Sequence, residues 1–133
     1  MAASSLIPGW SGVGATTVYV RLRDNGSADV LDFWSNPSAT GATGLGTVSL
    51  NSDFVTGTVT FAALATLSTT TVDGASASSV TITLGSPSGS GTLRTSTANV
   101  AMTWLPSAAA TDTTGVAVST QAVTESGAAD RDF

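Results

Sequence analysis

The feature that most constrains the fold is a two-residue alternation of apolar and polar side chains, which recurs in short segments of the chain. In residues 16–23 the apolar positions are Val18, Val20 and Leu22, and polar or aromatic residues flank each of them. Residues 79–84 repeat the pattern. Successive side chains of a β-strand point to opposite faces, so this spacing is typical of a strand with one buried face. We therefore predict strands over both segments.

Turn signals divide much of the remaining sequence into further short segments. Asn25-Gly26 predicts a hairpin turn over residues 24–27, because these residues accept the positive φ that tight turns require. Gly57 is expected to mark a bulge in a strand over residues 54–64. The other expected elements are strands over residues 28–34, 47–50, 66–72 and 92–95, loops over residues 35–46 and 85–91, and a turn over residues 72–75. The inward positions expected in the longer strands are Val59, Phe61, Ala63, Val80, Ile82 and Leu84.

Residues 99–123 are expected to form a strand, a loop and a closing strand. The alternating apolar positions of the first strand are Val100, Met102 and Trp104. Pro106 is expected to end that strand because proline has no N–H to donate to the ladder. Residues 112–115 then predict a turn, and a second alternation predicts a strand over residues 116–123.

Composition agrees with an all-β chain. Ser and Thr make up about a third of the 133 residues, and Thr and Val favour strands whereas Ser and Gly favour turns. We predict one antiparallel, immunoglobulin-like β-sandwich of about seven to nine strands over residues 15–123. An extended N-terminal arm (residues 1–14) and a C-terminal tail (residues 124–133) are expected to flank it. Trp34 or Trp104 is expected to be the core tryptophan.

The residue inventory argues against most catalytic and metal chemistry. The chain contains no His, Cys or Lys, which removes a Ser-His-Asp triad, a zinc site and a Schiff base. We predict no enzymatic activity, no cofactor and no metal. Asp24, Asp29 and Asp32 are expected to be solvated turn carboxylates rather than calcium ligands. The Asp29/Asp32 and Asp130/Asp132 pairs do not indicate a cleft, because their members are neighbours along a strand or tail.

Charge and hydropathy argue against nucleic-acid and membrane partners. The net charge is −5 and only four residues are basic, whereas nucleic-acid affinity depends on neutralising phosphates. No secretory signal and no membrane-spanning run of apolar residues are recognised. We expect a soluble protein made in a cytoplasm. A surface with few charges leaves strand edges poorly guarded, so a partner that covers them is expected.

The last third of the chain resembles bacterial Ig-like domains. Residues 80–84, followed by residues 102–115, are similar to the strand and the Ala-Thr-Asp-x-x-Gly-Asn turn of that family. Asp112 and Gly115 fit the turn, whereas Val116 stands where Asn is usual. The resemblance implies a sandwich and says little about function, because Ig-like sandwiches have many roles.

In size and composition the chain also resembles small structural proteins of tailed bacteriophages, above all capsid decoration proteins. That resemblance implies a virion protein on the outer capsid surface, made in the host cytoplasm. Its implied partner is the major capsid protein, and self-association as a homo-oligomer is a further expectation. Decoration proteins hold neighbouring capsomers together through arms and loops.

The residues expected to contact a partner lie in the arm and the tail. In the arm they are Leu6, Ile7 and Trp10, because large apolar side chains serve as anchors in interfaces. In the tail they are Arg131 and Phe133, because a terminal aromatic residue and its carboxylate suit a partner's pocket. Deleting residues 1–14 is expected to leave a folded domain that no longer binds capsids.

Two other functions stay open at this point. One is a tail- or fibre-associated domain that contacts the host surface, with Tyr19, Trp34 or Trp10 stacking on the sugar rings of a glycan. The other is a tail-tube subunit, which predicts self-assembly into rings.

Overall fold

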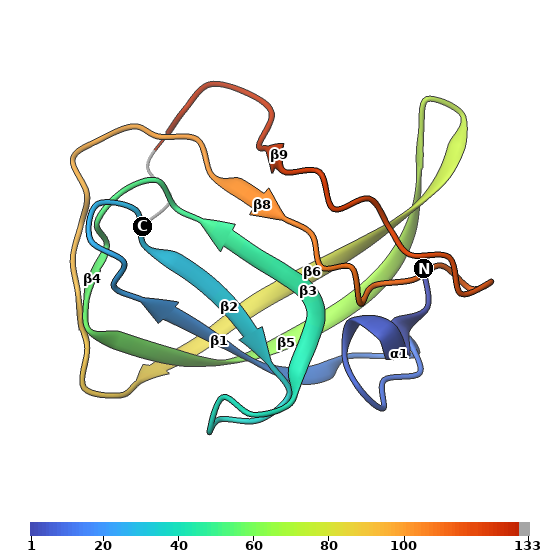
Figure 1. The fold of residues 1–133 in the computed structure, drawn as a ribbon, viewed down its shortest axis with the longest axis horizontal. Helices are drawn as coiled ribbons and strands as arrows, with labels where there is room; N and C mark the ends of the chain where they lie inside the picture. Colours follow the sequence, from blue (N-terminus) through green and yellow to red (C-terminus); the bar gives the residue numbers. More distant parts are fainter. Residues whose placement is uncertain (131–133) are drawn as a thin grey trace.

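The structure, a computed structural model, describes residues 1–130 and consists almost entirely of β-strands (Figure 1). Its elements are α1 (Ala3–Leu6), β1 (Thr16–Arg23), β2 (Val30–Trp34), β3 (Ala42–Ser49), β4 (Val55–Thr56), β5 (Thr58–Val72), β6 (Ala75–Ser88), β7 (Thr92–Leu93), β8 (Thr103–Leu105) and β9 (Val123–Thr124).

Seven strands form one antiparallel sheet in the order β6-β5-β1-β2-β3-β8-β9, and β4 pairs with β7 separately. The sheet curls back on itself. Side chains of β6 consequently line the same hollow as side chains of β3 and β8, which are four and five places away in the strand order. Figure 1 shows β6 passing across β3 in this view. The predicted all-β, sandwich-like fold is confirmed, and an immunoglobulin-like topology stays a prediction.

The core lies inside this curl. The predicted alternation of β1 is confirmed over its full length, since Val18, Val20 and Leu22 are fully buried. On β5 the predicted inward residues Val59, Phe61 and Ala63 are buried as well. Val20 lies opposite Phe61, and Leu22 opposite Val59, so the two strands share one apolar face. Burial of this face is the main driving force for the fold.

The N-terminal segment is not an extended arm. Leu6, Ile7 and Trp10 are 3%, 2% and 5% exposed and belong to the chain's own core. Three hydrogen bonds attach the segment to Thr111: Ala2 N–H and the Ser5 hydroxyl donate to the Thr111 carbonyl at 2.8 and 3.4 Å, and Thr111 N–H donates to Ser5 Oγ at 2.9 Å. The expectation of an extended arm is therefore corrected. Burial of its apolar side chains in the chain's own core stabilises the fold without a partner.

Gly44 explains how closely the N-terminal segment approaches the sheet. A Cβ atom built on Gly44 of β3 would lie 2.0 Å from the carbonyl oxygen of Ser5. Only a residue without a side chain leaves room for the backbone of α1 at this point. β3 already begins at Ala42, so glycines in the expected loop over residues 35–46 also allow close packing within a strand.

β5 and β6 are longer than predicted. The extended backbone is interrupted at Gly57, where φ is +82°, between β4 and β5. β5 then runs through residue 65, where the sequence predicts a gap between two separate strands. β6 includes most of the expected loop over residues 85–91, with Pro87 opposite Phe61. Proline is tolerated there because β6 is at the edge of the sheet. The turn predicted over residues 72–75 is confirmed, with positive φ at Asp73 and Gly74.

The C-terminal third departs most from the prediction. β8 ends at Leu105, before Pro106, as predicted, and the turn from Asp112 to Gly115 is confirmed by an N–H···O bond of 3.2 Å between these residues. The closing strand expected over residues 116–123 is wrong, because Val123–Thr124 pairs with β8, whereas residues 116–118 make only a short antiparallel contact with residues 110–112, including the isolated Thr111–Ala117 bridge. Val116 is 63% exposed, whereas Val118 is half-buried and packs against the core. The predicted boundary at residue 124 falls inside β9.

The core tryptophan is also different from the prediction. Trp34 is half-buried and Trp104 is 40% exposed, whereas Trp10 is buried. Trp104 is held by a hydrogen bond from its Nε1 to the Leu45 carbonyl at 2.7 Å. Alternation alone did not distinguish the inner face of β8, a short strand near one end of the sheet, from the core.

Candidate functional site

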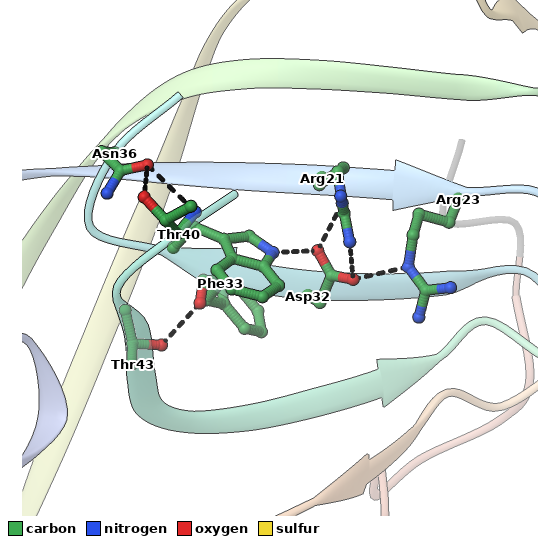
Figure 2. Close-up of polar contacts among 8 residues, drawn as sticks. Arg21, Arg23, Asp32, Phe33, Asn36, Thr40 and Thr43 are labelled. Carbon is green, nitrogen blue, oxygen red and sulfur yellow. Dashed lines mark hydrogen bonds and ion pairs between the residues drawn. The ribbon is translucent and has the colours of Figure 1, made fainter. Parts of the chain in front are cut away.

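A polar cluster around Asp32 lies on the outer face of β1 and β2 (Figure 2). Arg21 lies opposite Asp32 in the ladder and donates from Nε and Nη2 to its two carboxylate oxygens, at 3.1 Å each. Arg23 Nε donates to Oδ2 at 2.5 Å, and Trp34 Nε1 donates to Oδ1 at 2.5 Å. The Arg21 guanidinium carbon also lies 5.1 Å from the centroid of the Trp34 ring. We call these four residues the Asp32 cluster.

The electrostatics of the Asp32 cluster fix its geometry. Burial of the Asp32 carboxyl favours the neutral form, but hydrogen bonds from Arg21, Trp34 and Arg23 and the charge of Arg21 outweigh it and lower the pKa of Asp32. Four donors satisfy the two oxygens, which is the usual acceptor capacity of a carboxylate. Asp32 therefore has a positioning role toward its neighbours.

A hollow of about 310 Å³ lies beside Trp34, over β3 and β8. It opens where the ladder between β2 and β3 is irregular: Asp32 and Trp34 are two positions apart, whereas their partners Thr47 and Ala42 are five positions apart. Gly46, with φ +80°, permits the irregularity, and a Cβ atom there would lie 2.1 Å from the Leu105 carbonyl oxygen. We call this space the outer hollow.

A second hollow, of about 360 Å³, lies inside the curl and is mostly apolar. β6 contributes Val80 and Ile82, and the opposite wall includes Phe33, Val48 and Trp104. Val80 and Ile82 are only half-buried, since within residues 1–130 no strand continues the sheet beyond β6. We call this space the inner hollow.

The free edge of β6 borders the inner hollow. β6 pairs only with β5, so within residues 1–130 its other edge has no strand partner along 14 residues. No residue of β6 is charged. At the far end the β5–β6 hairpin extends beyond the body of the protein, and residues 69–76 are exposed on both faces (Figure 1). This edge carries no charge. Its two protective features, Pro87 and the register shift at which Phe61 and Ala63 face Pro87 and Leu84, lie near the C-terminal end of β6 and leave residues 75–84 without such protection.

The structure does not bring the predicted contact residues together. Leu6, Ile7 and Trp10 are in the core, which leaves little of them accessible to a partner. Arg131 and Phe133 lie outside the described residues. Of the aromatic residues considered for sugar stacking, Trp10 is buried, whereas Tyr19 and Trp34 lie directly opposite each other on the outer face and are half-buried.

Two of the three aspartates expected in solvated turns are buried. Asp29 is fully buried, and its carboxyl accepts N–H groups of Asn25, Phe54 and Val55 at 3.0, 2.7 and 2.8 Å. Asp32 is 7% exposed. Both expectations are corrected: Asp29 accepts from Phe54 and Val55, which are distant in sequence, and the pairing of β1 with β2 places Asp32 beside two arginines. Only Asp24 fits the prediction, as an exposed residue whose pKa is lowered by N–H groups of Gly26 and Gly57.

Sequence reasoning missed the β6 edge and both hollows as sites. The uncharged run from Gly74 to Leu93 was a usable signal for an unguarded strand edge. The outer hollow had no signal, since it depends on the irregular pairing of β2 with β3.

Among residues 1–130, no group of three or more acidic side chains is placed to hold a metal ion. No helix within that range is long and apolar enough to cross a membrane. Comparison with known proteins gives no match: no family model, no curated protein and no solved structure is significantly similar to this chain.

Proposed function

We propose that this chain is a non-enzymatic structural protein that decorates the outer surface of a tailed-bacteriophage capsid. In this proposal an extended segment of the major capsid protein adds to the free edge of β6. The partner class comes from the resemblance in size and composition described above, and the mode of attachment comes from the geometry of β6.

The observation that carries the proposal is the edge of β6, which carries no charge and, within residues 1–130, has no strand partner; residues 75–84 of this edge also lack a bulge or a proline. Strand addition supplies affinity through main-chain hydrogen bonds, and it needs an edge that is long and free of guarding charges. The exposed hairpin tip at residues 69–76 lets a neighbouring subunit reach this edge without meeting the body of the protein.

The inner hollow supports the same mode of attachment. An added strand places every second side chain toward the inside of the curl, next to Val80 and Ile82. Apolar side chains of the partner would there cover Phe33, Val48 and Trp104, which this chain leaves partly open. Strand addition that combines an edge with side-chain pockets gives both affinity and specificity.

Many copies on a shell make weak attachment sufficient. Each copy needs only moderate affinity if neighbouring sites cooperate, because linked binding events act through a high effective concentration. The small number of charged residues makes this attachment less sensitive to salt than a charge-driven interface.

Co-sedimentation with purified phage heads tests the proposal. Val80→Asp and Ser78→Asp each place a carboxylate at the inner hollow beside the β6 edge, and we expect both to weaken binding at least about tenfold. Thr66→Asp, on the exposed face of β5, is the matched control and should bind like the unmodified protein. Circular dichroism shows whether each variant is folded.

Two results would overturn this function. One is co-sedimentation of both hollow variants as strongly as the control. The other is absence of the protein from heads, with antibody label confined to tails or missing from all particles in electron micrographs.

A further inference from the structure

We propose that the outer face carries a saccharide site, in which one neutral pyranose ring occupies the outer hollow and stacks against Trp34. This inference is independent of where the protein sits on a particle and of the β6 edge, because the outer hollow lies on the other face of the sheet. It rests on the Asp32 cluster and on the residues that line the hollow.

The indole of Trp34 is held in place before any ligand arrives. Its Nε1 donates to Asp32 at 2.5 Å, and the Arg21 guanidinium lies 5.1 Å from the ring centroid. Figure 2 shows the Asp32 carboxylate contacted by Arg21 from above and by Arg23 from the right. A fixed aromatic ring loses little conformational entropy on binding, which favours recognition by stacking.

Trp34 borders the outer hollow on the side away from Arg21. β1, which carries Arg21, and β3, which lines the hollow, flank β2 on opposite sides. The indole thus has an arginine toward one strand and open space toward the other. A pyranose presents C–H groups on its flat faces, and such groups pack on aromatic carbon.

The remaining lining supplies hydroxyl groups and apolar walls. Leu105 and Pro106 form an apolar wall, while Thr47 and Ser107 provide hydroxyls. Thr47 Oγ1 has no hydrogen-bond partner within residues 1–130, so it is available both to donate and to accept. Gly46 and Ala42 contribute little side-chain bulk to the lining, and Phe33 adds a further apolar side chain.

The charge of the lining selects a neutral ligand. The one ionisable side chain that borders the hollow is Asp32, and its oxygens already accept four hydrogen bonds from neighbours in the chain. A volume of about 310 Å³ is at the small end of ligand sites and suits one ring rather than an extended ligand. Hydroxyl donors, an aromatic ring and no free charge together match a neutral sugar.

Titration of the full chain followed by NMR tests this site. The probes are neutral trisaccharides of glucose, of galactose and of N-acetylglucosamine, added into the millimolar range. We expect at least one of them to shift the Trp34 indole N–H signal and the amide signals of Thr47 and Ser107 with a common dissociation constant.

Variants separate stacking from hydrogen bonding. Thr47→Val keeps the shape of the side chain without the hydroxyl and should weaken binding about three- to tenfold. Trp34→Leu keeps an apolar side chain without the ring and should weaken it at least about tenfold. Thr56→Val, on the exposed surface of β4, is the matched control and should leave binding unchanged.

The positioning role of Asp32 has its own readout. Asp32→Asn should displace the Trp34 indole signal of the free protein and weaken saccharide binding, whereas Asp53→Asn should do neither. Absence of titratable shifts with all three trisaccharides would overturn the proposal. So would shifts that map to the inner hollow, or binding that persists unchanged in Trp34→Leu.

Discussion

Arg21 and Asp32 lie directly opposite each other on β1 and β2, and two guanidinium nitrogens of Arg21 donate to the two carboxylate oxygens of Asp32 at 3.1 Å each. A bidentate pair fixes both distance and orientation. Because the same arginine stacks on Trp34 and the same carboxylate accepts the indole N–H, one ion pair sets the arrangement of the outer face.

Asp32→Asn is expected to lower the free energy of unfolding by about 1–3 kcal/mol, because it leaves two arginines without their charged partner. The side chains of Arg21 and Arg23 are 27% and 39% exposed, so solvent keeps the loss below that of a fully buried pair. Asp53→Asn removes the exposed partner of Arg94 and should cost at most about 1 kcal/mol. Urea denaturation of both variants measures the difference, and equal losses would contradict it.

Stability is expected to fall in acid, in part through Asp32. Its pKa in the folded protein is below the ordinary value of 3.8, so its contribution is present above that pH and is lost as the pH falls through the folded pKa. Asp24 and Asp112 also have lowered pKa values, but both remain in an Asp32→Asn variant. Unfolding free energy plotted against pH should therefore have a shallower acid slope in that variant. Parallel curves would refute the assignment to Asp32.

Asp29→Asn is expected to destabilise the protein by about 2–4 kcal/mol. The buried carboxyl of Asp29 accepts three backbone N–H groups, and an amide in its place turns an NH₂ group toward at least one of these donors. Ser27→Ala, exposed in the same turn, should change stability by less than about 0.5 kcal/mol. Thermal unfolding followed by circular dichroism compares the two, and a near-neutral Asp29→Asn would show that the turn rearranges without cost.

Removal of residues 1–10 is expected to abolish cooperative folding, in contrast to the expectation for a free arm. Trp10→Ala alone should cost about 3–5 kcal/mol, because it leaves a large cavity beside Leu6 and Ile7 in the core. Val13→Ala is the control, since Val13 is 84% exposed. Dispersion of amide signals in NMR spectra distinguishes a folded from an unfolded truncation. A well-folded truncated protein would contradict this prediction and support a free N-terminal arm.

Local patterns in the sequence predicted the elements whose conformation depends mainly on residues close to one another in the chain. β1 was predicted with its bounds, because strict alternation over eight residues leaves one register with a buried face. The hairpin turn at Asp73-Gly74 was predictable because few residues accept positive φ at adjacent positions. By contrast, the alternation at Val116 and Val118 predicts a strand, but within residues 1–130 this segment makes only a short antiparallel contact with residues 110–112 and joins neither sheet.

The sequence by itself determined an all-β chain, the direction in which β1 and β5 face, and the scarcity of charge along β6. These properties follow from spacing and side-chain chemistry within single segments. Only the tertiary structure decided that Trp10 enters the core, that Asp29 caps distant N–H groups, and that β6 ends the sheet beside an apolar hollow. Each of these depends on contacts between residues far apart in the chain, and the burial that makes them favourable exists only once the sheet has curled.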